Sequence, residues 1–155
     1  MSEKKIIHED EVVSFLNSWK NGVINIGKKF TENDDFISEA KNFISQHYNF
    51  NESDVLFKPT FTKEIVFRNN PEDALSYFVK GDISEDNGFA IKPWKKIDLL
   101  DLNLITENNY CFSMGVLELF PVSNNKNTKI AFTFVLIKDS NNSIKIIVHH
   151  SSPIL

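Results

Sequence analysis

The chain has 155 residues, of which 41% are hydrophobic and 25% are charged, values typical of one globular domain and not of a disordered or fibrous chain. Lys and Arg number 17 against 21 Asp and Glu, and the net charge of -4 argues against nucleic acid or an anionic membrane as a partner. The single cysteine, Cys111, excludes an intramolecular disulfide, and no apolar run could span a bilayer. We therefore expect one cytoplasmic domain over residues 1–155, with residues 1–8 as a flexible N-terminus.

Apolar residues that recur every three or four positions predict helices in the first half of the chain. Gly22 and Gly27 interrupt the first stripe and predict a kink or an early end. Asn33 or Asp34 could cap the second helix. The third begins at Asn70, followed by a proline and two acidic residues, and stops near a glycine. The expected helices span about residues 12–30, 36–48 and 71–80.

Residues with strand character dominate the second half, and turn signals separate them. A short strand is also expected before the third helix, ended by Pro59. Helices first and a meander after indicate an α+β fold, with the helices packed on one face of a curved antiparallel sheet. Such a sheet can curl into a cone or open half-barrel around a pocket. The expected strands are residues 55–58, 89–97, 102–106, 111–120, 129–137 and 143–150.

The last strand carries two adjacent histidines and two adjacent serines. Side chains alternate between the faces of a strand, so His149 and Ser151 share one face, and His150 and Ser152 share the other. The two histidines therefore do not form one metal site, since zinc needs three or four converging ligands. The alternative for His149 is a core histidine bonded to a backbone carbonyl. Other residues that could bind a metal are far apart in the predicted elements: His8, His47 and Cys111.

A second cluster of candidate residues surrounds the third helix. Thr60 follows Pro59 where the chain turns, so its hydroxyl could face a cavity, or it could simply stabilise the turn. Tyr77 lies among apolar neighbours, and a buried tyrosine hydroxyl usually has a partner. Arg68, the only arginine, is more often a surface salt-bridge residue than an anion clamp. The sequence contains no glycine-rich phosphate loop and no serine elbow.

Five motifs, in this order, resemble those of the iota-class carbonic anhydrases, over roughly residues 15 to 153. They are Val55-Leu56-Phe57-Lys58-Pro59-Thr60, Ala74-Leu75-Ser76-Tyr77-Phe78-Val79, Gly88-Phe89-Ala90-Ile91 with Pro93-Trp94, Met114-Gly115, and His149-His150-Ser151-Ser152-Pro153. The resemblance implies a nuclear-transport-factor-two-like fold, a cone-shaped sheet wrapped around helices, similar to the association domain of calcium/calmodulin-dependent kinase. It also implies a homodimer that interconverts carbon dioxide and bicarbonate. Some members of the family work without metal, and others are linked to zinc or manganese; we expect no metal here.

The resemblance assigns the catalytic site to four residues: Thr60, Tyr77, His149 and Ser151. Carbon dioxide is apolar, and we expect three aromatic side chains to line a dry pocket for it: Phe57, Phe78 and Trp94. An imidazole with an ordinary pKa of about 6.5 could act as the base for the attacking water. The three hydroxyls could then orient the water and stabilise the developing bicarbonate oxygens.

The sequence departs from the family pattern around the predicted pocket. Val116 and Leu117 follow Met114-Gly115 where an asparagine and an aromatic are expected, and Lys80 stands where a small residue is usual. One alternative function is a non-catalytic dimerising or ligand-binding module of the same superfamily, because a fold does not fix a function. Another is a dehydratase-like or cyclase-like enzyme, which would need an acidic base such as Glu118 facing the cavity.

Overall fold

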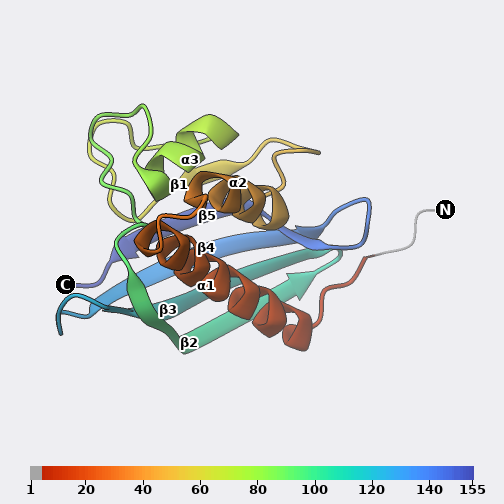
Figure 1. Cartoon of the computed structure of the whole chain (residues 1–155). Helices are drawn as coiled ribbons and strands as arrows, with labels where there is room; N and C mark the ends of the chain where they lie inside the picture. Colours follow the sequence, from red (N-terminus) through yellow and green to blue (C-terminus); the bar gives the residue numbers. More distant parts are fainter. Residues whose placement is uncertain (1–4) are drawn as a thin grey trace.

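The computed structural model describes residues 5–155, and its three helices lie on one side of a five-stranded sheet (Figure 1). This arrangement confirms the expected α+β fold with a curved sheet. None of the described helices has the length and apolar character needed to cross a membrane. The elements are α1 (Glu9–Thr31), α2 (Phe36–His47), β1 (Leu56–Lys58), α3 (Pro71–Val79), β2 (Trp94–Glu107), β3 (Tyr110–Pro121), β4 (Thr128–Lys138) and β5 (Ile144–Pro153).

Helix α1 runs unbroken for 23 residues, so the early end expected at its glycines is wrong. Both glycines serve close packing. A Cβ on Gly22 would come within 2.4 Å of the Phe43 ring, and one on Gly27 within 2.9 Å of the Ala90 carbonyl oxygen. The absence of a side chain therefore lets α2 and the segment before β2 approach α1 closely.

The two shorter helices begin at side-chain caps. The cap of α2 is Asp35, which accepts the Ser38 N–H at 3.1 Å, so the expected cap at Asn33 or Asp34 is wrong by one or two positions. Asn70 caps α3 as expected and accepts the Asp73 N–H at 2.8 Å.

Strands β2 to β5 form an antiparallel meander, in the sheet order β1-β5-β4-β3-β2. The expectation of a wholly antiparallel sheet is wrong at one edge, because β1 pairs with β5 in parallel. The chain leaves β1 through α3 and the whole meander before it returns, so the two strands can align in the same direction. This pairing sets Phe57 opposite His149 and Lys58 opposite His150.

The segment before β2 differs from the prediction. The expected strand over residues 89–97 is a turn up to residue 92, closed by Gly88 at a φ of 81° and by a 3.2 Å bond from the Ile91 N–H to the Gly88 carbonyl. Strand β2 then continues to Glu107, so the second expected strand, residues 102–106, belongs to it. A register shift between Leu99 and Asp101 explains the weaker alternation there.

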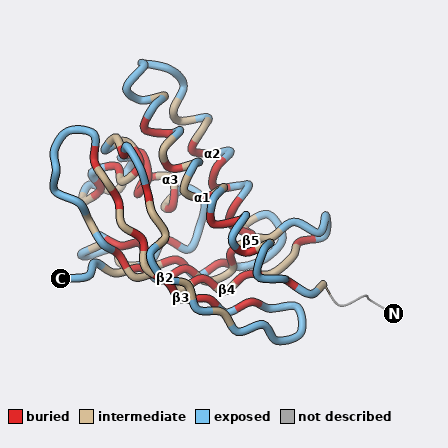
Figure 2. Tube along the Cα trace, turned by 90° about the horizontal axis from the view of Figure 1, so that it is seen from below, coloured by how far each residue is buried: buried red, intermediate tan, exposed pale blue. Residues whose placement is uncertain are grey.

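Buried and exposed residues alternate along the strands (Figure 2). The inner face packs against α1, whose buried stripe includes Trp19 and Val23. The outer face of the sheet, by contrast, exposes large apolar side chains, among them Phe112 at 42% and Met114 at 61%.

The described part of the N-terminal segment contacts the sheet. Ile7 is buried, and the Lys138 ammonium donates to the Ile6 carbonyl at 3.1 Å. Residues 1–4, which belong to the predicted flexible segment, lie outside the described residues, and the mobility of residues 1–8 stays a prediction.

Candidate active site

Three elements bring the four candidate residues together. Thr60 follows β1 directly after Pro59, and Tyr77 lies on the buried side of α3. His149 and Ser151 lie on the inner face of β5. The parallel pairing of β1 with β5 carries Thr60 to the same end of the sheet as Ser151. All four side chains are buried.

The strand-parity prediction is confirmed at β5. The Nε2 atom of His149 lies 2.6 Å from the Ser151 Oγ, and both residues are buried. His150 is exposed on the opposite face, and Ser152 is half-buried there. The register shift between β4 and β5 lies before residue 148, so the alternation beyond it stays regular.

The four residues line one small cavity of about 10 Å³. Two of the three predicted wall residues, Phe57 and Phe78, line it as well. Trp94 does not; its ring lies 5.6 Å from that of Phe89, and its Nε1 donates to the Phe89 carbonyl at 2.8 Å. The lining residues are Trp19, Phe57, Pro59, Thr60, Tyr77, Phe78, Phe89, Ile130, His149 and Ser151.

Tyr77 presents a protonated hydroxyl to this cavity. Burial raises the pKa of Tyr77 above its ordinary value, and a hydrogen bond from the Phe61 N–H, at 3.3 Å, opposes this only in part. The oxygen accepts from the backbone and also interacts with the Thr60 side chain, and the protonated hydroxyl keeps a hydrogen to donate.

His149 is enclosed by aromatic rings. The Phe57 ring stacks on it at 4.6 Å, and the Phe134 ring meets it edge-on at 4.5 Å. Burial lowers the pKa of His149 well below the ordinary histidine value, and electrostatic interaction with His150 and Lys58 lowers it further. The imidazole is therefore neutral. A general base would need a pKa near neutrality, and the pKa of His149 lies well below that.

Two further side chains extend this arrangement behind His149. The Tyr48 hydroxyl lies 2.9 Å from His149 Nδ1, and the Trp19 Nε1 donates to the Tyr48 oxygen at 3.2 Å. Tyr48 is fully buried. The sequence places Trp19 and Tyr48 at apolar positions of the first and second expected helices. Their polar tips on buried faces were a signal that partners must exist, although the sequence could not say which.

Lys58 was also missed. Its ammonium donates to the backbone carbonyls of Ser151, at 2.9 Å, and Thr60, at 3.3 Å. Burial lowers the pKa of Lys58. One cation thereby joins the two backbone segments that carry hydroxyls into the cavity.

Arg68 is not a surface residue, which corrects the sequence-based expectation. Its guanidinium is fully buried and binds both carboxylate oxygens of Asp86, at 2.6 and 2.8 Å. Ser76 donates to the same carboxylate at 2.7 Å. Because Asp86 takes up the guanidinium, Arg68 fixes α3 and its flanking loops and does not form an anion site.

Glu118 does not face the cavity. It lies on the outer side of β3, opposite Asp98 and Lys129 of the neighbouring strands, so the dehydratase-like alternative lacks its acidic base. Within residues 5–155, no three His, Cys, Asp or Glu side chains are grouped to hold a metal ion.

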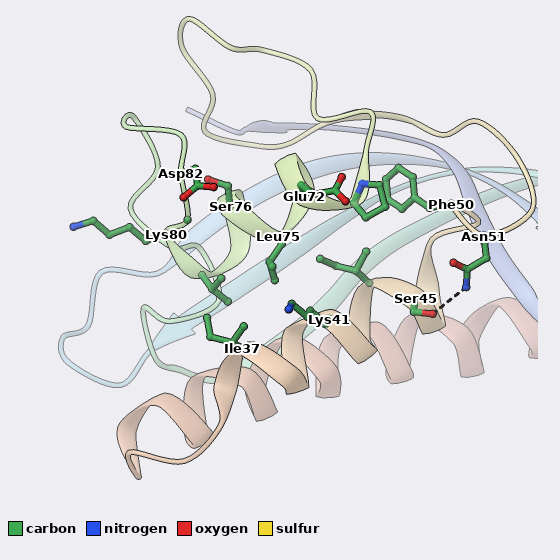
Figure 3. Close-up of a pocket in the computed structure, with 14 residues that line it drawn as sticks. Ile37, Lys41, Ser45, Phe50, Asn51, Glu72, Leu75, Ser76, Lys80 and Asp82 are labelled. Carbon is green, nitrogen blue, oxygen red and sulfur yellow. Dashed lines mark hydrogen bonds between the residues drawn. The ribbon is translucent and has the colours of Figure 1, made fainter.

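Of the larger pockets outside this cavity, two are lined in part by α3. One of about 460 Å³ separates α2 from α3 and contains none of the four candidate residues (Figure 3). Ile37 and Leu75 contribute to its apolar wall, and Lys41 and Lys80 lie at its edge (Figure 3). The other, of about 400 Å³, shares Tyr77 and Phe89 with the cavity and so adjoins it.

Comparisons with known proteins identify the family of this chain. The family described as metal-independent carbonic anhydrase matches residues 10–153. A metal-independent carbonic anhydrase from Nostoc sp. (strain PCC 7120) is 29% identical over 153 residues, covering 96% of this chain and 74% of the relative.

Solved structures also match this chain. The iota-carbonic anhydrase from a cyanobacterium, complexed with bicarbonate, superimposes with a TM-score of 0.92 at 28% identity, covering 100% of this chain and 97% of that one. A protein of the NTF2-like family from Streptomyces avermitilis shares the fold, with a TM-score of 0.66 at 10% identity over 94% of this chain and 95% of its own. With a family match over nearly its whole length, the chain belongs to the metal-independent carbonic anhydrases.

Proposed function

We propose that this protein catalyses the reversible hydration of carbon dioxide to bicarbonate without a metal cofactor, in the cavity formed by Thr60, Tyr77, His149 and Ser151. The observation that carries the proposal is the convergence of three hydroxyls on an apolar cavity beside a buried, neutral imidazole. Family membership and the similarity to a bicarbonate complex support it.

The cavity suits both reactants. Its aromatic walls, Phe57 and Phe78 among them, favour an apolar molecule such as carbon dioxide. Hydroxyls aimed at one point stabilise negative charge on oxygen, so they lower the pKa of a water held there and stabilise the bicarbonate that forms. The water oxygen bonds to carbon, one carbon–oxygen π pair moves to oxygen, and one proton leaves.

We propose that this proton passes to bulk solvent and does not stay on His149. A protonated His149 would be a buried cation next to Lys58, and burial already lowers the pKa of the imidazole strongly. The adjoining pocket, which shares Tyr77 with the cavity, offers a route to solvent. The base role expected from the sequence is therefore replaced by a structural one.

The alternative of a non-catalytic module has one observation in its favour. The cavity of about 10 Å³ has room for roughly one water molecule, which is too little for both reactants. Catalysis therefore requires the cavity to open. The Thr60–Phe61 segment is the element we expect to move, since Phe61 is exposed and lines the adjoining pocket.

Stopped-flow carbon dioxide hydration with protein purified in chelator tests the proposal. We expect wild-type activity to survive, and Thr60→Ala and Ser151→Ala each to lower the rate by about tenfold to a thousandfold. Ser113→Ala is the matched control. Ser113 is a buried serine on the inner face of β3, and its hydroxyl donates to the Phe134 carbonyl outside the cavity. Activity no higher than that of buffer would favour the non-catalytic module.

We also propose that the protein is a homodimer that associates through the outer face of its sheet. Ile105, Phe112 and Met114 expose between 42% and 68% of their surfaces there, and such apolar patches usually mark contacts. Light scattering should give twice the chain mass for wild type and one chain mass for Met114→Glu. Ile65→Glu changes an exposed apolar residue elsewhere and should leave the dimer intact. A monomeric wild type would contradict this proposal.

The remaining expectations, one domain and a cytoplasmic location, are kept as proposals. A single cluster of buried residues joins all three helices to the sheet, which supports one domain. The one cysteine is free and buried, as suits a reducing compartment. Limited proteolysis and cell fractionation test the two points.

A further inference from the structure

We infer that Tyr48 is a positioning residue of this active site, because its hydroxyl holds His149 in the tautomer that carries hydrogen on Nε2, which turns the Ser151 hydroxyl hydrogen into the cavity. The inference rests on the proposed function only in so far as Ser151 acts on the substrate.

A continuous row of hydrogen bonds connects the helices to the cavity. Trp19 of α1 donates from Nε1 to the Tyr48 oxygen at 3.2 Å. The Tyr48 hydroxyl, just after the end of α2, meets His149 Nδ1 at 2.9 Å. His149 Nε2 meets the Ser151 Oγ at 2.6 Å. Four side chains from three elements thus share three hydrogen bonds, and the direction of each can be worked out.

The direction at Tyr48 follows from what each group can do. An indole N–H can only donate, so the Tyr48 oxygen accepts from Trp19. Tyr48 is fully buried, and among residues 5–155 its hydroxyl has one other partner, His149 Nδ1. If Nδ1 carried a hydrogen, the tyrosine hydrogen would be buried without an acceptor, at a cost of about 1–3 kcal/mol. Tyr48 therefore donates, and Nδ1 is the unprotonated nitrogen.

The second half of the row follows from the neutral ring. With Nδ1 unprotonated, the single ring hydrogen lies on Nε2, which donates to the Ser151 oxygen. The Ser151 hydroxyl must then direct its own hydrogen elsewhere, and the cavity that it lines is the open direction. Ser151 becomes a committed donor, like Tyr77.

The groups around the ring favour the same state. Lys58 on β1 and His150 on β5 both disfavour a protonated His149. The other contacts are uncharged aromatic side chains: Trp19 of α1, Tyr48 beside α2, Phe57 of β1 and Phe134 of β4. Among the described residues, no carboxylate contacts the ring to stabilise an imidazolium, so the tautomer should persist across the working range of pH.

Nitrogen NMR of protein labelled with ¹⁵N-histidine tests the tautomer directly. Long-range proton–nitrogen correlation should give His149 a pyridine-type shift at Nδ1 and a pyrrole-type shift at Nε2, unchanged from about pH 6 to about pH 8. Loss of one signal set in His149→Gln assigns the resonances. The opposite pattern, or two pyrrole-type shifts from a charged ring, would overturn the inference. The measurement needs no turnover, so it is independent of whether the protein is catalytic.

The positioning role is tested with Tyr48→Phe. Without the hydroxyl, neither tautomer has a partner at Nδ1, so we expect a mixture of the two and a fall in kcat/KM of about fivefold to a hundredfold. Ser113→Ala, which also removes a buried hydroxyl bond, should lose similar stability yet keep the Nε2–H pattern and the wild-type kcat/KM. An unchanged kcat/KM in Tyr48→Phe, or an equal fall in Ser113→Ala, would overturn the role. Should Tyr48→Phe not fold, the wild-type spectrum still decides the tautomer.

Discussion

The acid stability of this protein should depend on His47, a buried histidine outside the proposed catalytic cavity. His47 lies at the end of α2, where its Nδ1–H donates to the Phe43 carbonyl at 2.7 Å and its Nε2 accepts from the Ser18 hydroxyl at 2.8 Å. Burial lowers the pKa of His47 from 6.5 to about 4, and the bond to Phe43 opposes this only in part. The folded protein therefore keeps the ring neutral where an unfolded chain would protonate it.

The sign and size follow from that pKa difference. Between pH 6.5 and about pH 4 the unfolded chain binds more protons than the folded one, so the free energy of unfolding falls as the pH falls. The contribution of His47 is complete above pH 6.5 and is lost as the pH drops toward 4. Between about pH 7 and about pH 4.5 the loss comes to about 2–3 kcal/mol.

Urea unfolding followed by tryptophan fluorescence, repeated across this range, measures the effect. His47→Gln should be less stable than wild type at about pH 7. Its free energy of unfolding should fall less toward acid than that of wild type, by about 2–3 kcal/mol over the window. His8→Gln removes an exposed histidine and should keep the wild-type slope. Equal slopes for wild type and His47→Gln would refute the assignment of acid sensitivity to this ring.

Three further substitutions test other parts of the structure. Arg68→Met should lower the free energy of unfolding by about 3–5 kcal/mol in urea, because it leaves Asp86 buried without its cation. The double variant with Asp86→Leu should recover part of this loss. An equal loss in the single and double variants would contradict the explanation. Lys58→Met should lower kcat/KM about tenfold by freeing the two carbonyls that the ammonium joins. Lys58→Arg should lower kcat/KM less. Unchanged kinetics in Lys58→Met would exclude the bridging role. Gly22→Ala should lower the free energy of unfolding by about 1–3 kcal/mol, because its Cβ would clash with the Phe43 ring. This loss is expected despite the better helix propensity of alanine. A raised melting temperature would contradict it.

Local patterns predicted the elements whose stability is local. The Asn70 cap with its following proline was readable because capping depends on adjacent residues. The strand expected over residues 89–97 failed because Gly88 adopts a left-handed φ that no apolar pattern reveals. The role of Gly22 also depends on a partner helix. Helix propensity treats the glycine as a weak point, whereas in the structure the missing side chain leaves room for the Phe43 ring of α2.

At the site, the sequence predicted the polar residues better than their roles. Strand parity paired His149 with Ser151 correctly because no bulge interrupts β5 between them. The resemblance named Thr60 and Tyr77, which line the same cavity. The pKa of His149 was not predictable, because the rings that enclose it come from α1, β1, β4 and the residue after α2, and their combined burial is a property of the fold.

The parallel edge strand explains why this site exists in the fold. An antiparallel β1 would have run in the opposite direction along β5 and carried Thr60 to the other end of the sheet, away from Ser151. In the parallel register, Phe57 stacks on His149 and Lys58 reaches back to the Ser151 carbonyl. One pairing thus encloses the imidazole, joins the two hydroxyl-bearing segments and closes the cavity under α3. A substitution that weakens β1 pairing should accordingly affect activity before it affects the stability of the meander, since β1 contributes three residues to the sheet and the meander strands contribute ten or more each.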